Sequence, residues 1–333
     1  MKRKKLGKGV LCFTVLLLVV WTILPIVWAP EATAAPEKVY LKMGGSNTGT
    51  LVYMVAAVIV DLWKANIPDL DITLMATPGS TANHLPIDRG EMDIAVSANS
   101  ADWWAHNGMH FTKTKLTNFC SLFPITKAFQ HAATYVDSPI KTWKDMDGKR
   151  VQLVARASPS SITFEEIFNV LNIRVNGVFS TPGEAIDMVK DKRVDAIVYG
   201  VGAPWSGFMD IARDTPIRFI PLQAADQEGV CKAVPHLSPS VLPAKTYSFQ
   251  NEDCPMPAAY PDIIVRPGLP EPLVYKLTKV AWEHWNDVVK GVSATKWVSP
   301  KDVVNMVAPI HPGAVKYYSE IGISIPDRLI WKK

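Results

Sequence analysis

Short apolar runs alternate with stretches of helical spacing along most of the chain. Residues 39–43 predict a strand, the polar loop 44–50 follows, and residues 51–64 carry apolar side chains at helical spacing. The same order of buried strand, small polar residues and helix recurs with strands predicted at 70–76, 93–97, 150–154 and 195–199. Ligands of open α/β sheets sit at the carboxyl ends of strands, so this pattern predicts an α/β fold with binding loops there.

The pattern occurs in two copies, one at about 39–100 and one at about 150–205. Extended stretches at 119–136 and 255–265 lie where the chain would cross between two lobes and back. Helical spacing at 271–290 and 299–322 would complete the first lobe. About 300 residues also exceed one comfortable core. The sequence therefore predicts two hinged lobes with a ligand cleft between them.

The N-terminal segment has the order of an export signal: basic residues 1–9, an apolar run at 10–28 and small residues at 32–35. We expect residues 1–34 to be a signal peptide cleaved between Ala34 and Ala35, leaving a periplasmic protein. The alternative is an uncleaved anchor, because the apolar run approaches the length of ~20 residues that spans a bilayer. Pro25 interrupts that run and favours cleavage.

Removing the signal changes the charge balance. It holds five of the 35 Lys and Arg and one of the 31 Asp and Glu, which leaves 30 against 30. A neutral chain lacks the clustered positive charge that phosphate contacts need, so we expect no nucleic acid partner. Cys120, Cys231 and Cys254 remain, and either a Cys231–Cys254 disulfide or three thiols fit the sequence. No cysteine or histidine spacing predicts a metal site, and we expect no cofactor.

The first loop, GGSNTGT, precedes a helix and offers backbone N–H groups to an anion. It lacks the ending of a phosphate-binding P-loop and the spacing of a dinucleotide fingerprint. No hydrolase elbow or metalloprotease motif is present, so we expect no catalytic residue and no enzyme. A periplasmic hydrolase using Ser158 or His311 is the weakest alternative, since His311 before Pro312 is more typical of a helix cap.

Six segments of the chain stand out by their order and spacing: residues 44–53, 77–83, 89–95, 146–151, 193–196 and 311–318. Together they resemble the extracytoplasmic solute receptors of TRAP transporters, in their TAXI subclass. The resemblance implies a type II periplasmic-binding-protein fold that delivers a small organic anion, such as a dicarboxylate, oxo acid or acidic amino acid, to a membrane permease. We expect residues 35–125 and 260–333 to form lobe 1 and 126–259 lobe 2. A receptor for an ABC importer or a sensor kinase is the alternative.

The expected ligand-binding residues follow strands in both lobes: Asn47, Thr48, Gly49, Thr50, Tyr53, Thr77, Gly79, Ser80, Ser97, Asn99 and Trp103, then Arg156, Ser158, Ser160, Tyr199, Ala203, Pro204 and Trp205. The hydroxyls and amides among them could equally cap helices, and only one of the paired tryptophans could pack in the core. Segment 154–160 lacks the glycines that the family usually has there and contains Arg156. That arginine either clamps a carboxylate or lies in solvent.

Overall fold

A computed structural model describes residues 38–332 of the chain. The predicted signal peptide, 1–34, and its cleavage site lie outside the described residues. Within 38–332, no helix combines the length and apolar character needed to cross a membrane.

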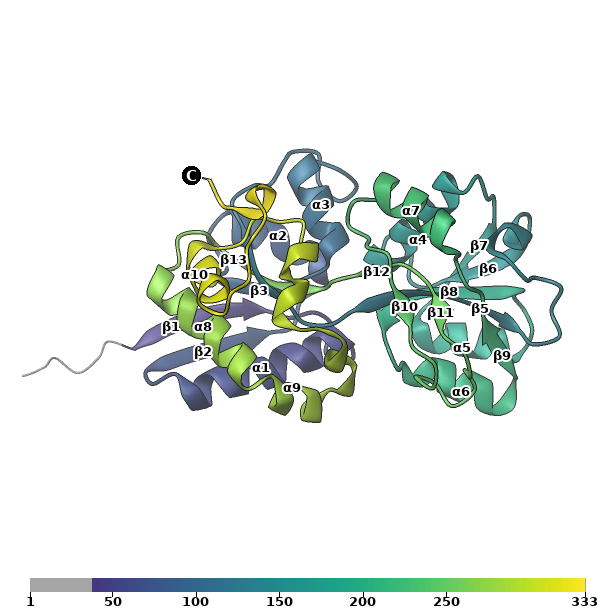
Figure 1. Cartoon of the computed structure of the whole chain (residues 1–333), viewed down its shortest axis with the longest axis horizontal. Helices are drawn as coiled ribbons and strands as arrows, with labels where there is room; N and C mark the ends of the chain where they lie inside the picture. Colours follow the sequence, from purple (N-terminus) through teal and green to yellow (C-terminus); the bar gives the residue numbers. More distant parts are fainter. Residues whose placement is uncertain (1–37, 333) are drawn as a thin grey trace, which may run out of the picture. The chain divides into compact units, whose positions relative to one another are not determined.

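The first sheet has the strand order β2-β1-β3-β13-β4 (Figure 1). Its strands are β1 (Val39–Gly44), β2 (Leu70–Met75), β3 (Ile94–Ser97), β4 (Cys120–Pro124) and β13 (Asp262–Val265). β1 pairs in parallel with both β2 and β3, whereas β13 runs antiparallel to β3 and β4. The accompanying helices are α1 (Leu51–Asn66), α2 (Ser80–Asp88), α3 (Asn99–Asn107), α8 (Glu271–Glu283), α9 (Trp285–Gly291) and α10 (Pro312–Glu320).

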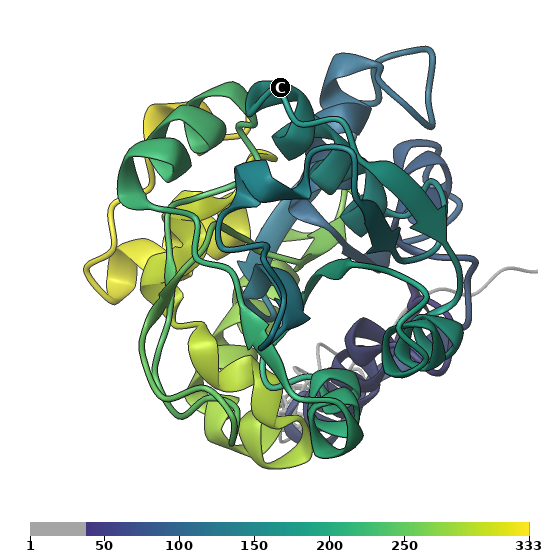
Figure 2. The ribbon, with the colours of Figure 1, turned by 90° about the vertical axis from the view of Figure 1, so that its right-hand side faces the viewer.

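The second sheet has the order β12-β5-β8-β6-β7, with β9 paired to β5. Its strands are β5 (Ala128–Tyr135), β6 (Arg150–Leu153), β7 (Asn176–Phe179), β8 (Ala196–Gly202), β9 (Ile217–Phe219) and β12 (Ala258–Ala259). Its helices are α4 (Pro159–Val170), α5 (Pro182–Lys190), α6 (Ser206–Asp214) and α7 (Ala224–Ala233). Figure 2 shows these helices on both faces of the sheet, where two separate apolar clusters form.

Shorter elements complete the chain: β10 (Val241–Leu242), β11 (Cys254–Pro255), η1 (Trp143–Met146), η2 (Ser293–Trp297), η3 (Pro300–Asn305) and η4 (Asp327–Leu329). β10 and β11 pair with each other. The chain passes between the sheets twice, from β4 to β5 and from β12 to β13. Each sheet therefore defines a lobe, and the two crossings lie within the extended stretches that the sequence predicts.

The strand predicted at 195–199 is longer in the structure. β8 runs from Ala196 to Gly202, because it pairs with β5 up to the Ala128–Gly202 pair. α4 begins at Pro159, because Ser158 caps the helix and Pro159 fits its first turn. Cys120, Cys231 and Cys254 are all free thiols, so the disulfide considered above does not form in the described chain.

Candidate functional site

The first two polar loops of lobe 1 are hydrogen bonded to each other. The Thr77 hydroxyl donates to the Gly45 carbonyl at 3.1 Å, and the Asn47 amide donates to the Pro78 carbonyl at 3.2 Å. The Tyr53 ring packs against Gly45, where a Cβ atom would lie 2.6 Å from the ring. Asn47, Thr48 and Gly49 remain exposed. The loops after β1 and β2 thus form one polar surface.

The predicted ligand residues lie at the starts of α1, α2, α3, α4 and α6, which all follow strands, and the N-termini of these helices differ. Thr50 caps α1 and Ser158 caps α4, each accepting a backbone N–H of its own helix. In contrast, α2, α3 and α6 begin after Gly79, Ala98 and Trp205 without a side-chain cap. The first N–H groups of a helix have no partner within the helix and carry partial positive charge. These three N-termini are therefore suited to an anion.

The capping alternative thus holds for Thr50 and Ser158. It also holds for His311, whose Nδ1 accepts the Gly313 N–H at the start of α10.

Arg156 lies on the exposed loop after β6. Its guanidinium stacks over the Phe179 ring, 3.8 Å from the ring centroid, which is a cation–π contact. Among residues 38–332, no carboxylate forms an ion pair with it. Nearby, the Ser160 hydroxyl accepts the Gly200 N–H at 2.9 Å and so joins α4 to β8. Arg156 is thus held by an aromatic ring and keeps its donors free.

Aromatic side chains surround the end of β8. The rings of Tyr199 and Trp205 meet edge to face at 4.9 Å, and Trp205 packs over Gly207, where a Cβ would lie 2.2 Å from the indole. The Tyr247 hydroxyl accepts the Trp205 backbone N–H at 2.9 Å and donates to His131 Nε2 at 3.2 Å. Burial lowers the pKa of His131 to about 4, so its ring is neutral and can accept that proton. This chain fixes the backbone at Trp205.

Several expected ligand residues lie at the junction of the lobes. A Cβ added to Gly202 would lie 2.7 Å from the Leu51 side chain, which places the start of α1 against the end of β8. The Ala203 carbonyl accepts the Trp297 indole N–H, and Pro204 beside it is half-buried. The Asn99 amide donates to the carbonyls of His236, at 3.3 Å, and Asn305, at 3.0 Å. Asn99 and Ala203 therefore connect lobe 1 with lobe 2.

Ser97 has different partners from those we expected. It is buried in a cluster with His84, Asp102, Ser121 and Asp262, which we call the sealed cluster because none of the five has exposed surface. The Ser97 hydroxyl donates to Asp102 Oδ1 at 2.5 Å, and His84 Nε2 lies 2.8 Å from the same oxygen. Ser121 donates to Asp262 Oδ2.

Burial sets the protonation of the sealed cluster. It raises the pKa of Asp102 to about 7, raises that of Asp262 well above its ordinary value, and lowers the pKa of His84 to about 4. His84 Nδ1 faces the Ser80 carbonyl, so the neutral ring carries its proton there and Nε2 is an acceptor. Protonated Asp102 then donates to Nε2. The serine proton goes to a carboxyl group, so these three residues do not form an activated nucleophile.

Trp103 and Trp104 behave as the helical alternative requires. Trp104 is fully buried, whereas Trp103 is half-buried and exposes part of its ring. The residues that sequence reasoning missed, Glu166 and His236, contact Trp104 from lobe 2. No spacing signal could reveal this contact, because three separate elements supply it.

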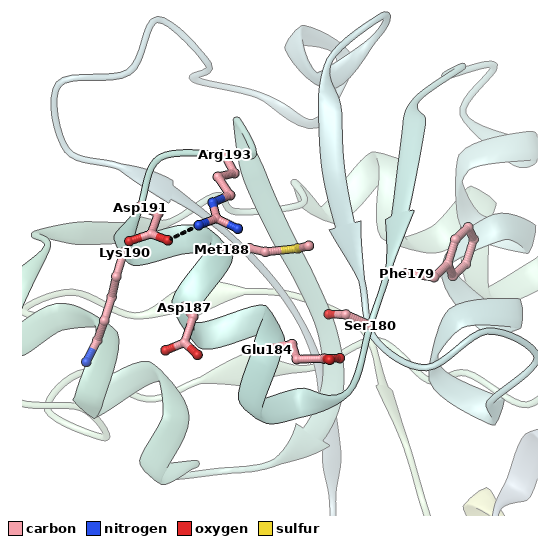
Figure 3. A pocket seen from close by; sticks show the side chains of 8 residues that line it. All are labelled: Phe179, Ser180, Glu184, Asp187, Met188, Lys190, Asp191 and Arg193. Atoms are coloured by element: carbon pink, nitrogen blue, oxygen red, sulfur yellow. Dashed lines mark ion pairs between the residues drawn. The ribbon is translucent and has the colours of Figure 1, made fainter.

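Four surface pockets are lined by lobe 2 residues and lie away from most predicted ligand residues. Figure 3 shows one, about 540 Å³ in volume, lined by residues including Phe179, Glu184, Lys190 and Arg193. Lys190 pairs with Asp210 and Asp214, and Arg193 pairs with Asp191. With both cations neutralised, this pocket is poorly suited to an anion. Within residues 38–332, no group of His, Cys, Asp and Glu could hold a metal ion.

The model of the NMT1-like family matches residues 43–322, which is most of the chain and includes both lobes. The chain belongs to the NMT1-like family. The family model therefore covers both sets of strand-end loops.

Solved structures with the same fold include malate-bound MatC from Rhodopseudomonas palustris. It is 16% identical, with 80% of this chain and 91% of that chain covered, at a TM-score of 0.51. Another is a periplasmic transporter that is 11% identical, with 86% and 94% of the two chains covered, at the same TM-score of 0.51. These likenesses confirm the predicted fold class, α/β with the two lobes of a type II periplasmic binding protein.

Proposed function

We propose that this NMT1-like protein is a periplasmic solute receptor that binds a small organic anion and delivers it to a TRAP-type permease. The observation that carries the proposal is the junction of the lobes, where the start of α1 meets the end of β8 and Asn99, at the start of α3, donates to the His236 carbonyl. In this proposal, residues 35–125 and 260–333 act as one lobe and 126–259 as the other. Export and cleavage after Ala34 belong to the same proposal.

The proposed site combines three kinds of contact with the ligand. The N–H groups at the starts of α2, α3 and α6, together with Asn47, Thr48 and Ser80, would hold anionic oxygens. Tyr199 and Trp205 would pack on the apolar part of the ligand. Arg156 would supply a bidentate contact to a carboxylate. The proposal needs no metal, cofactor or catalytic residue.

A thermal-shift screen of the exported protein tests the ligand class. MatC binds malate, so dicarboxylates come first, followed by oxo acids and acidic amino acids. An anion present at a hundred times its dissociation constant adds about 2.7 kcal/mol to the free energy of unfolding. Neutral sugars and cationic amino acids serve as controls. If only the neutral sugars or cationic amino acids stabilise the protein, the proposal that its ligand is an organic anion is contradicted.

Arg156→Ala tests the clamp. Removing one partner of a buried charge pair costs about 2–5 kcal/mol, so carboxylate affinity should fall at least thirtyfold while the fold survives. Phe179→Leu is a matched variant, because it removes the ring under the guanidinium and keeps the charge. Titration calorimetry of both variants against wild type measures the effect. A change below threefold for Arg156→Ala would place the ligand charge on the helix N-termini alone.

The transporter type needs a separate test. A receptor for an ABC importer or a sensor kinase would have the same fold, and the two differ in the membrane partner. Genes beside this one that encode a permease without an ATPase favour the TRAP assignment, and an ATPase gene favours the importer. A hydrolase would turn over a trial ester and lose that activity in Ser158→Ala or His311→Ala, yet both residues already serve as helix caps.

A further inference from the structure

Glu166 on α4 of lobe 2 receives hydrogen bonds from both lobes. The Trp104 indole on α3 donates to Glu166 Oε1 at 3.0 Å, and His110, just after α3, reaches the same oxygen at 3.3 Å. From its own lobe, His236 Nε2 lies 2.8 Å from Oε2. We call these four residues the closing contact. They link α3 of lobe 1 to α4 and the segment after α7 of lobe 2.

The closing contact is largely shielded from water. Trp104 and His236 are 0% and 1% exposed, and the Glu166 side chain is 22% exposed. Burial raises the pKa of Glu166, but hydrogen bonds from His236 and Trp104 outweigh it and lower the pKa overall. His236 Nδ1 is buried without a hydrogen-bond partner among residues 38–332, whereas Nε2 faces the carboxylate, so Nε2 carries a proton and donates it to Glu166 Oε2. Glu166 is therefore an ionised acceptor with donors on both sides.

A second set of hydrogen bonds supports the same seam. The Asn99 amide of lobe 1 donates to the His236 carbonyl, and the Ser238 hydroxyl of lobe 2 donates to Asn305 Oδ1 at 3.3 Å. Trp104 also packs edge to face on the rings of His110 and His236, with centroids 4.6 and 5.6 Å away. Separating the lobes would expose the Trp104 ring and break its only indole hydrogen bond in the described chain.

We propose that Glu166 is a positioning residue that holds the lobes together and thereby sets ligand affinity without touching the ligand. The expected loss of ligand affinity rests on the proposed function, whereas the contact that holds the lobes together does not. Hydrogen bonds to an ionised group stabilise by more than neutral ones, and a ligand that binds only the closed form loses apparent affinity in proportion to the closed fraction. Loss of the contact should weaken binding about tenfold.

Two measurements on the exported protein test the proposal, with malate as the probe. Small-angle scattering without malate gives the radius of gyration, and calorimetry gives the malate affinity. Glu166→Ala should increase the radius and weaken malate binding about tenfold. Trp104→Phe, which keeps an aromatic ring but removes the donor, should shift both in the same direction by less. Glu165→Ala is the matched control, because Glu165 is the exposed neighbour on the same helix.

The outcomes separate the two proposals. If Glu166→Ala and Trp104→Phe both have the radius and affinity of the Glu165→Ala control, the closing contact does not hold the lobes and the inference is overturned. If none of the proteins binds malate, the result counts against malate as the ligand under the proposed function. The radii of the four proteins then decide the closing contact alone.

Discussion

The sealed cluster and the closing contact each pair a carboxyl group with a histidine, but the pKa values of their carboxyl groups are shifted in opposite directions. In the sealed cluster, burial dominates and raises the pKa of Asp102 to about 7. In the closing contact, donors from His236 and Trp104 outweigh burial and lower the pKa of Glu166. Asp102 has a histidine whose Nε2 can only accept, whereas Glu166 has one whose Nε2 donates. The balance between burial and donated hydrogen bonds thus decides whether the acid is neutral or charged.

The two clusters also differ in where their members come from. The sealed cluster draws on α2, β3, α3, β4 and β13, all elements of lobe 1. The closing contact draws on both lobes. Breaking the first should therefore unfold lobe 1, whereas breaking the second should change how the lobes meet.

The largest effect is expected for Asp102→Ala. The change removes the shared partner of His84 Nε2 and the Ser97 hydroxyl, which keep only a longer contact of 3.2 Å with each other, and losing a buried polar partner costs about 1–3 kcal/mol. We expect the free energy of unfolding to fall by about 3 kcal/mol, measured by urea denaturation. Glu166→Ala, in the closing contact, should cost less than about 1 kcal/mol because its partners can reach water when the lobes part. Equal losses in the two variants would contradict the division.

A pH effect of intermediate size is expected from the same cluster. The folded-state pKa of Asp102, about 7, lies above its unfolded value of 3.8, so its contribution to stability is complete below about pH 4 and is lost as pH rises through 7. The raised pKa of Asp262 acts in the same direction. His84 acts oppositely, since its pKa is lowered to about 4 and its contribution is lost as pH falls from 6.5 towards 4.

Asp262→Asn isolates the acid contribution, because it removes one titrating carboxyl and keeps the shape. Between pH 5.5 and 7.5, the melting temperature of wild type should fall relative to that of the variant. Calorimetric scans at several pH values measure the difference. If the difference in melting temperature between wild type and Asp262→Asn does not change with pH, Asp262 does not retain a proton in the folded protein.

The elements of the fold were predictable because each depends on local pattern. Strand β3 is a buried apolar run, and α1 has a polar loop before it and apolar spacing within it, so neighbours in sequence carry the signal. Tertiary context decided the exceptions: β8 extends to Gly202 only because β5 lies beside it. The two crossings were predictable for the same reason as the strands, since extended stretches mark them.

The clusters were not predictable, because their residues meet only in the fold. His84, Asp102 and Asp262 come from three elements, and nothing in their spacing brings them together. Ser97 illustrates the difficulty most clearly. A small polar residue at the end of a buried strand has the same sequence context whether its hydroxyl faces a ligand or an internal carboxyl group. The sequence therefore suggested a ligand contact, and the structure places the hydroxyl on Asp102.

Ser97→Ala is the smallest and most specific test of that difference. The variant loses one donor to Asp102 but keeps the bond between Asp102 and His84, so the free energy of unfolding should fall by only about 1 kcal/mol. Malate affinity should stay within twofold of wild type, because the hydroxyl faces the interior of lobe 1. Ser160→Ala is the companion variant, since Ser160 is a half-buried serine in the first turn of α4 and is also a predicted ligand residue. A large loss of malate affinity in Ser97→Ala with unchanged stability would mean that Ser97 contacts the ligand and that the sealed cluster opens towards the ligand site.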